Sequence, residues 1–188
     1  MRHDGSLISK LNGSWHEYAV WGFMAIASAH VAEHVVQTVQ IFALGWARPE
    51  ARGLFGQWFP WLVTSETLHY FYAIFTLAGI ALLLPGFKGR ARLWWVVALL
   101  AQFWHHIEHV LLLFQRVAEE PFFGRQVPTS LIQLWFPRVE LHLFYNAVVL
   151  VPLLVALGYH LFPSASELGA ATCGCARRLL RRASAAAA

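Results

Sequence analysis

Residues 93–117 read LWWVVALLAQFWHHIEHVLLLFQRV, and this stretch decides the class of the protein. It is 25 residues long and mostly apolar, and about 20 helical residues suffice to cross roughly 30 Å of bilayer hydrocarbon. A helix is expected because a span in lipid must satisfy its own backbone hydrogen bonds. Among the ionisable residues of its second half are His105, Glu108 and His109. The stretch therefore predicts a transmembrane helix with polar groups inside the bilayer.

Three further apolar runs of similar length lie near residues 18–44, 61–84 and 138–162. Hydrophobic residues make up 58% of the 188-residue chain and charged residues 13%, about half the charged share of a soluble protein. Tryptophans crowd the ends of the four runs, as an aromatic belt at the membrane interface requires. We therefore expect an all-α integral membrane protein, a bundle of four transmembrane helices, with no nucleic-acid partner.

Prolines punctuate these runs. Pro60 and Pro137 stand where helices begin, and Pro85 with Gly86 ends the second run. Pro152 lies inside the fourth run, where the missing N–H predicts a kink.

The chain contains one pattern twice. His30, Glu33, His34 and Gln40 recur with the same spacing as His105, Glu108, His109 and Gln115. Downstream, Trp58-Phe59-Pro60 and His69-Tyr70-Phe71-Tyr72 recur as Trp135-Phe136-Pro137 and His142-Leu143-Phe144-Tyr145. Because each unit has two spans, corresponding helices run in the same direction, and the sequence predicts two parallel repeats related by an axis along the membrane normal.

The repeat divides the chain and the basic residues orient it. Residues 15–86 and 87–163 form the repeats, 1–14 form an N-terminal tail, and 164–188 form a basic, disordered tail. Nine basic residues fall on one side: Arg2, Lys10, Lys88, Arg90, Arg92, Arg177, Arg178, Arg181 and Arg182. Five fall on the other: Arg48, Arg52, Arg116, Arg125 and Arg138. The positive-inside rule places both termini in the cytoplasm, here of a bacterial inner membrane, where residues 177–182 are suited to anionic lipid headgroups.

Helical periodicity gathers the polar residues on inward faces. At 100° per residue, His30, Glu33 and His34 share an arc of about 100°. The third helix repeats this arc, whereas His106 points away from it. At about 1.5 Å per residue the histidines of all four helices reach one level near the midplane. The expected inner constellation is His30, Glu33, His34, His69, His105, Glu108, His109 and His142.

Imidazole is the commonest metal ligand in proteins, and histidines at i and i+4 on one helix can reach one ion. Each half supplies such a pair, a third histidine and a carboxylate, so we expect a dinuclear centre of two transition-metal ions. Nitrogen-rich ligation suits iron or copper, with zinc as a further option. Tyr72 and Tyr145 share helix faces with His69 and His142 and are the candidate catalytic residues.

The H-x-x-x-H pair followed by a later histidine, present twice, resembles the copper ligation of tyrosinases and haemocyanins in ligand spacing. Histidine-rich membrane sites are also similar to those of fatty-acid desaturases and hydroxylases, which bind two irons. Both resemblances are confined to ligand spacing and assign no family. They imply an oxidoreductase of the oxygenase, desaturase or quinol oxidase type, acting on a lipophilic substrate or a quinol and served by electron-donor or other membrane subunits.

Three alternatives stay open at this point. In the first, b-type haem or a pigment is clamped by His69 with His142 or by His34 with His109. In the second, the same residues carry ions or protons through the membrane as part of a transporter. In the third, the histidines only form interhelical hydrogen bonds.

Residues outside the arc are assigned lesser roles. Cys173 and Cys175 are interpreted as ordinary thiols in a cytoplasmic tail. His3, His16, His106 and His160 are expected to be dispensable for metal binding. The loop 118–130 is expected to cap the outer mouth of the bundle, either as a lid or as a docking surface, with a passive connector as the alternative.

Overall fold

The computed structural model describes residues 6–170, 173 and 175. In this part of the chain four helices are long and apolar enough to cross a membrane. They are α2 (His16–Phe42), α5 (Glu66–Leu83), α6 (Gly89–Ala118) and α7 (Arg138–Leu161). No strand occurs among the described residues. The expected all-helical class with four candidate spans is confirmed.

Short helices join and flank the long ones. The segment between α2 and α5 forms α3 (Phe55–Trp58) and α4 (Trp61–Thr64), and η1 (Leu84–Gly86) extends α5. The other connection contains η2 (Ile132–Leu134), and the ends carry α1 (Leu7–Leu11) and α8 (Ala165–Ala170). Residues 165–170 of the expected disordered tail are thus helical, whereas residues 177–182 and those after them lie outside the described residues.

The second long helix starts later than the apolar run suggests. Ser65 adopts an extended backbone and its hydroxyl accepts a hydrogen bond from the Leu68 N–H, so it caps α5. The chain from Trp61 forms the separate turn α4. As a result His69 is the fourth residue of α5, and His142 is the fifth residue of α7. His69 and His142 therefore lie closer to the N-terminal ends of α5 and α7 than to the middles of these helices. We call this end of the bundle the loop end.

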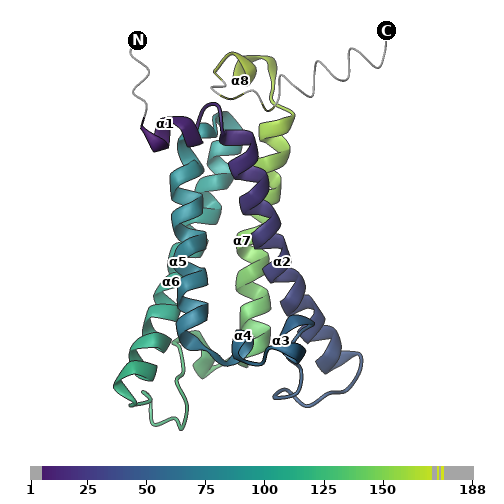
Figure 1. Ribbon diagram of the computed structural model, residues 1–188, viewed down its shortest axis with the longest axis vertical. Helices are drawn as coiled ribbons and strands as arrows, with labels where there is room; N and C mark the ends of the chain where they lie inside the picture. The colour runs from purple at the N-terminus through teal and green to yellow at the C-terminus, as the bar shows by residue number, and fades with distance from the viewer. Residues whose placement is uncertain (1–5, 171–172, 174, 176–188) are drawn as a thin grey trace.

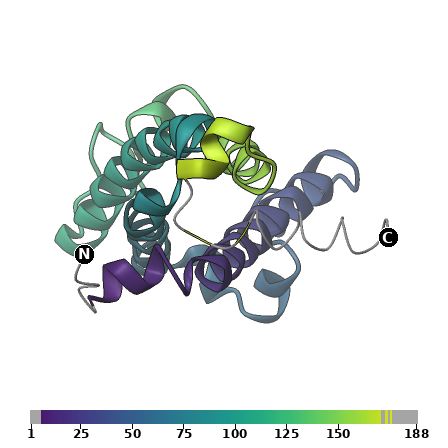
Figure 2. The same ribbon diagram turned by 90° about the horizontal axis from the view of Figure 1, so that it is seen from above.

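The bundle is packed unevenly. Helix α6 packs along both α5 and α7, whereas α2 packs mainly on α7 and touches α5 at few points. The views along and down the bundle show α5 and α6 together, with α2 diverging from them toward the loop end (Figure 1, Figure 2). Trp95 and Gln102 of α6 donate hydrogen bonds to carbonyls of Ile80 and Ala73. The helices therefore pack closely where α6 meets α5 and α7, and they pack more loosely between α2 and α5.

The faces that point outward are apolar. Large side chains such as Val35, Phe71, Leu100 and Phe144 are 47–64% exposed on the four long helices. Soluble proteins rarely expose contiguous apolar surface on this scale. Lipid would cover these faces, which supports the interpretation as a membrane protein.

Two glutamines fasten the loops at the same end of the bundle. The Gln40 side chain exchanges two hydrogen bonds with the backbone of Gly53, at 2.9 and 3.1 Å. The Gln115 side chain makes the same pair with the backbone of Thr129, at 2.9 and 3.1 Å. Both connecting segments are therefore held beneath the histidine-bearing helices by matching contacts.

Candidate metal centre

The six predicted histidines lie together inside the bundle. Five of them are 3–8% exposed, namely His34, His69, His105, His109 and His142, and His30 is half-buried. They come from all four long helices. The structure therefore brings together the imidazoles that the two sequence patterns single out.

The second half of the chain forms the tighter set, which we call the closed triad: His105, His109 and His142. One ligand atom from each lies within 4.8 Å of the others, and all three side chains are buried. The two Nε2 atoms of His105 and His109 are 3.2 Å apart. Metal–nitrogen bonds of about 2.0–2.1 Å at a tetrahedral angle would set two nitrogens about 3.3 Å apart. The pair is thus spaced as ligands of one ion are.

The third imidazole of the closed triad is oriented by the backbone. His142 Nδ1 donates to the Arg138 carbonyl oxygen at 3.1 Å, which leaves Nε2 with its lone pair free. That Nε2 atom is buried and has no hydrogen-bond partner. Buried polar atoms are normally satisfied, so an ion held by the triad would give this nitrogen the partner it lacks.

The first half forms the open triad: His30, His34 and His69. The Nε2 atoms of His30 and His34 are also 3.2 Å apart. His34 Nδ1 donates to the Gln37 side-chain oxygen at 2.7 Å, and His69 Nδ1 donates to the Ser65 carbonyl at 2.8 Å. Each of these two rings keeps Nε2 available. All three rings line a cavity of about 310 Å³ that opens between α2, α3, α4 and α5.

The two triads adjoin. The ring centroids of His34 and His142 are 5.5 Å apart, and those of His69 lie 6.0 Å from both His109 and His142. At these distances the imidazoles of the two triads are direct neighbours. Ions held by the two triads would be neighbours.

The two predicted carboxylate ligands make other contacts. Both oxygens of Glu33 accept hydrogen bonds from backbone N–H groups of Leu54 and Phe55 at the start of α3, at 2.7–3.3 Å. Glu108 accepts a long bond of 3.4 Å from the Ile132 N–H at the start of η2. In both halves the glutamate thus caps a short loop helix. Only Glu108 keeps a buried oxygen, Oε2, without a hydrogen-bond partner.

Gly53 allows the Glu33 contact. Its φ of +76° is a left-handed conformation that side chains rarely adopt, and a Cβ there would meet Glu33 Oε2 at 2.2 Å. Glycine is therefore required for the first loop to approach α2 this closely.

The two predicted tyrosines stand against the histidine pairs. Tyr72 stacks on His30 with a centroid distance of 3.8 Å, and Tyr145 lies 4.6 Å from His105. The Tyr145 hydroxyl accepts a hydrogen bond of 2.8 Å from the Trp104 indole. Tyr72 also lines the cavity. His106 faces elsewhere, against Tyr70 at 5.4 Å.

One ion pair next to the site is not part of the sequence prediction. Arg138 of α7 binds both carboxylate oxygens of Glu66 of α5. These residues lie one turn before His142 and His69, so the pair braces the two helices at the level of the third ligands. The signal in the sequence is a single charge near the start of each apolar run, three or four residues before the histidine.

No family model, characterised protein or solved structure matches the chain. The assignment of a function consequently depends on the geometry of the site.

Proposed function

We propose that the protein is a membrane metalloenzyme that holds two transition-metal ions in the six-histidine site and oxidises a lipophilic substrate or a quinol. The proposal rests on one observation: the buried closed triad lies next to the open triad, and the open triad lines a cavity. Closed metal sites in proteins are mostly structural, whereas catalytic sites keep a position open for substrate. The open triad offers such a position.

Iron or copper is the proposed metal because six neutral imidazoles suit these ions and because both change oxidation state. When bound at this site, iron or copper would carry electrons from the substrate to O2. The protein's part is to fix the imidazoles: backbone carbonyls hold His69 and His142 through Nδ1, and Gln37 holds His34 in the same way. Such outer contacts orient metal ligands and raise their basicity.

The cavity favours a lipophilic substrate. Phe55, Leu62, Val63 and Leu68 line this cavity together with the three histidines. Tyr72 lines the same cavity and could hold a proton at its hydroxyl group beside the reacting molecule. The proposal includes a separate membrane subunit or a quinol as the source of electrons.

The matched contacts of the two halves support the proposed duplication. Histidine pairs of equal spacing, glutamines that bind a loop backbone and glutamates that cap a loop helix occur once in each half. We include two parallel repeats in the proposal, with both termini in the cytoplasm as the basic residues indicate. Modification of a cysteine placed in the loop 47–56 from the cytoplasmic side would contradict this orientation.

Haem b is the less favoured cofactor. The ring centroids of His105 and His109 lie 5.5 and 5.3 Å from that of His142. They fill the space around the residue that would have to bind the macrocycle. A macrocycle would displace imidazoles that already pack against one another.

Metal loading of the purified protein tests the proposal. Detergent-solubilised protein would be loaded with Fe2+, Cu+ or Zn2+ in turn, and bound metal counted by mass spectrometry. We expect the His34→Ala, His109→Ala double variant to hold two ions fewer than the wild type, and His106→Ala to match the wild type. O2 uptake with a quinol should follow the iron or copper content. A Soret band, or equal metal content in the double variant and the wild type, would overturn the proposal.

A further inference from the structure

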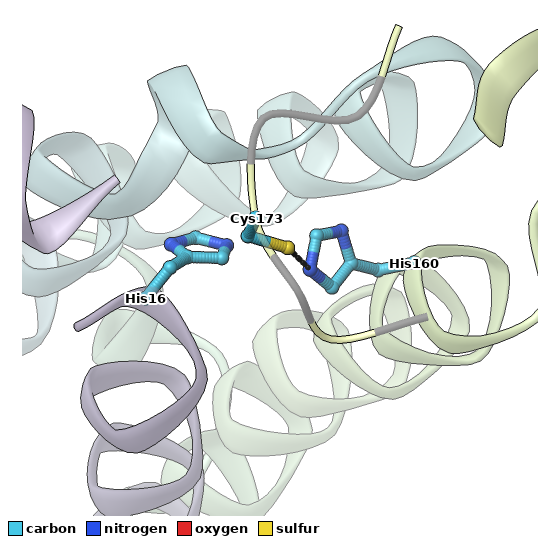
Figure 3. Close-up of side chains that lie close together, drawn as sticks. All are labelled: His16, His160 and Cys173. Atoms are coloured by element: carbon cyan, nitrogen blue, oxygen red, sulfur yellow. Dashed lines mark hydrogen bonds between the residues drawn. The ribbon is translucent and has the colours of Figure 1, made fainter. Parts of the chain in front are cut away.

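A second group of metal-ligating side chains lies at the other end of the bundle. His16 is the first residue of α2, and His160 is the second-last residue of α7. Together with Cys173 they offer three ligand atoms within 4.8 Å of one another, all from buried residues. Figure 3 shows the two imidazoles on either side of the thiol. The cluster joins three segments that are far apart in the sequence.

His16 is positioned as a ligand. Its Nδ1 donates to the Leu11 carbonyl at 3.1 Å, and its Nε2 has no hydrogen-bond partner although the residue is 0% exposed. Gly86 gives the ring its space, since a Cβ there would meet His16 Cε1 at 2.2 Å. The imidazole is therefore buried in one orientation with an unused lone pair directed at the cluster.

His160 and the cysteines complete the group. The His160 Nε2 atom lies 3.3 Å from the Cys173 sulfur. Cys175, also buried, places its sulfur 2.8 Å from that of Cys173. Thiolate is the form of cysteine that binds metal.

The chain before the cysteines is anchored to the bundle. Glu167 of α8 forms an ion pair of 2.9 Å with Arg90 and accepts a hydrogen bond from the Arg90 backbone N–H. The Arg90 hydrogen bonds lower the pKa of the Glu167 carboxyl, which favours its charged form. A small cavity of about 10 Å³ borders Gly86, His160 and Cys173. The cysteines are thus delivered to the histidines by contacts independent of any metal.

We propose that His16, His160, Cys173 and Cys175 form a second metal site, a four-coordinate zinc site that clips the C-terminal segment to the start of α2 and the end of α7. Two thiolates and two imidazoles are a usual ligand set for structural zinc. Bonds of about 2.3 Å at a tetrahedral angle would set the sulfurs about 3.8 Å apart, so binding would part them by roughly 1 Å. The site is closed by four protein ligands, in contrast to the open triad.

Cobalt substitution tests this site without reference to activity. The chain has only two cysteines, so a sulfur-to-cobalt charge-transfer band in the full-length protein loaded with Co2+ must arise from Cys173 or Cys175. We expect this band in the wild type and its complete loss in the Cys173→Ser, Cys175→Ser double variant. In His16→Ala, half of the full band should require at least a tenfold higher free Co2+ concentration than in the wild type.

Two controls separate the sites. His106→Ala and His105→Ala should keep the full band, because neither residue belongs to the cluster, whereas the double serine variant should keep the metal of the six-histidine site. Absence of the band in reduced wild-type protein would overturn the proposal. So would a band of unchanged intensity and unchanged Co2+ affinity in both His16→Ala and His160→Ala, because the cysteines would then bind the ion alone.

Discussion

The open and closed triads have the same residue types at the same helical spacing, yet they differ in enclosure. In each, two Nε2 atoms one helical turn apart lie 3.2 Å from each other. The closed triad brings its third ligand within 4.8 Å, while the open triad faces a cavity of about 310 Å³. The pair distance is local to one helix. The third ligand comes from a second helix, so its position depends on how closely the two helices pack.

The packing difference has visible causes. Helix α6 is bound to α5 by Trp95 and Gln102 and packs along α7, so the closed triad lies where three helices meet. Helix α2 meets α5 at few points, and α3 and α4 fill part of the space between them. A duplicated pattern has thus produced one site suited to holding an ion and another suited to exposing one.

Replacement of His142 should have the largest effect, because its imidazole adjoins histidines of both triads. The His142 ring lies 5.3–6.0 Å from the rings of His34, His69, His105 and His109. His142→Ala should therefore lose the ion of the closed triad and weaken binding at the open triad, leaving less than half of the central metal. Mass spectrometry of loaded protein measures this, with His106→Ala as the matched control. Full metal content in His142→Ala would show that the triads do not depend on this residue.

Single replacements in each triad should separate the two. His105→Ala should remove the more tightly held ion, and His30→Ala the more weakly held one, because His30 is half-buried beside the cavity while His105 is 6% exposed. Titration with a chelator of graded strength should give two classes of metal in the wild type. The strong class should vanish in His105→Ala. If both variants lose the same class, the difference in enclosure has no effect on affinity.

Two ion pairs that join the first half of the chain to the second differ in burial. Arg138→Ala should leave Glu66, 8% exposed, without its partner, whose own side chain is 36% exposed. Because the pair is only partly buried, the cost should lie below the roughly 3–5 kcal/mol of a fully buried pair. Arg48→Ala breaks the ion pair between Arg48, 52% exposed, and Glu140, 27% exposed. Because this pair is more exposed, its loss should cost about 0–1 kcal/mol. Thermal unfolding in detergent should rank the variants in this order. An equal shift in Tm would mean that the Glu66 pair is not buried in the protein in solution.

Two glycines test the backbone of the first loop. Gly45 and Gly53 have φ of +72° and +76°, but only a Cβ at Gly53 meets an atom within 4 Å. Gly45→Ala should cost about 1 kcal/mol through backbone conformation alone. Gly53→Ala should cost more, because it also pushes the Glu33 carboxylate from the loop. Unfolding temperatures and the metal content of the open triad provide the measurement. Equal Tm values for the two variants would show that the Glu33 contact does not stabilise the protein.

Much of the fold follows from the sequence because its causes are local. Lipid requires long apolar helices, and helix geometry puts His30 with His34 and His105 with His109 whatever surrounds them. The apolar run places the start of α5 one short helix too early, because Ser65 and the preceding turn interrupt it. Hydropathy does not detect such an interruption, whereas a serine able to cap a helix is a signal that it occurs.

The amino-acid sequence by itself determined the four candidate spans, the two histidine pairs and their inward faces, because these depend on residues within one or two helical turns of each other. The tertiary structure decided which triad closes, since that depends on the approach of α6, rather than α2, to its neighbours. It also decided that Glu33 and Glu108 cap loop helices, and that His16 and His160 meet Cys173. Those contacts join segments as far apart as His16 and Cys173, and no local rule relates such segments before the helices have packed.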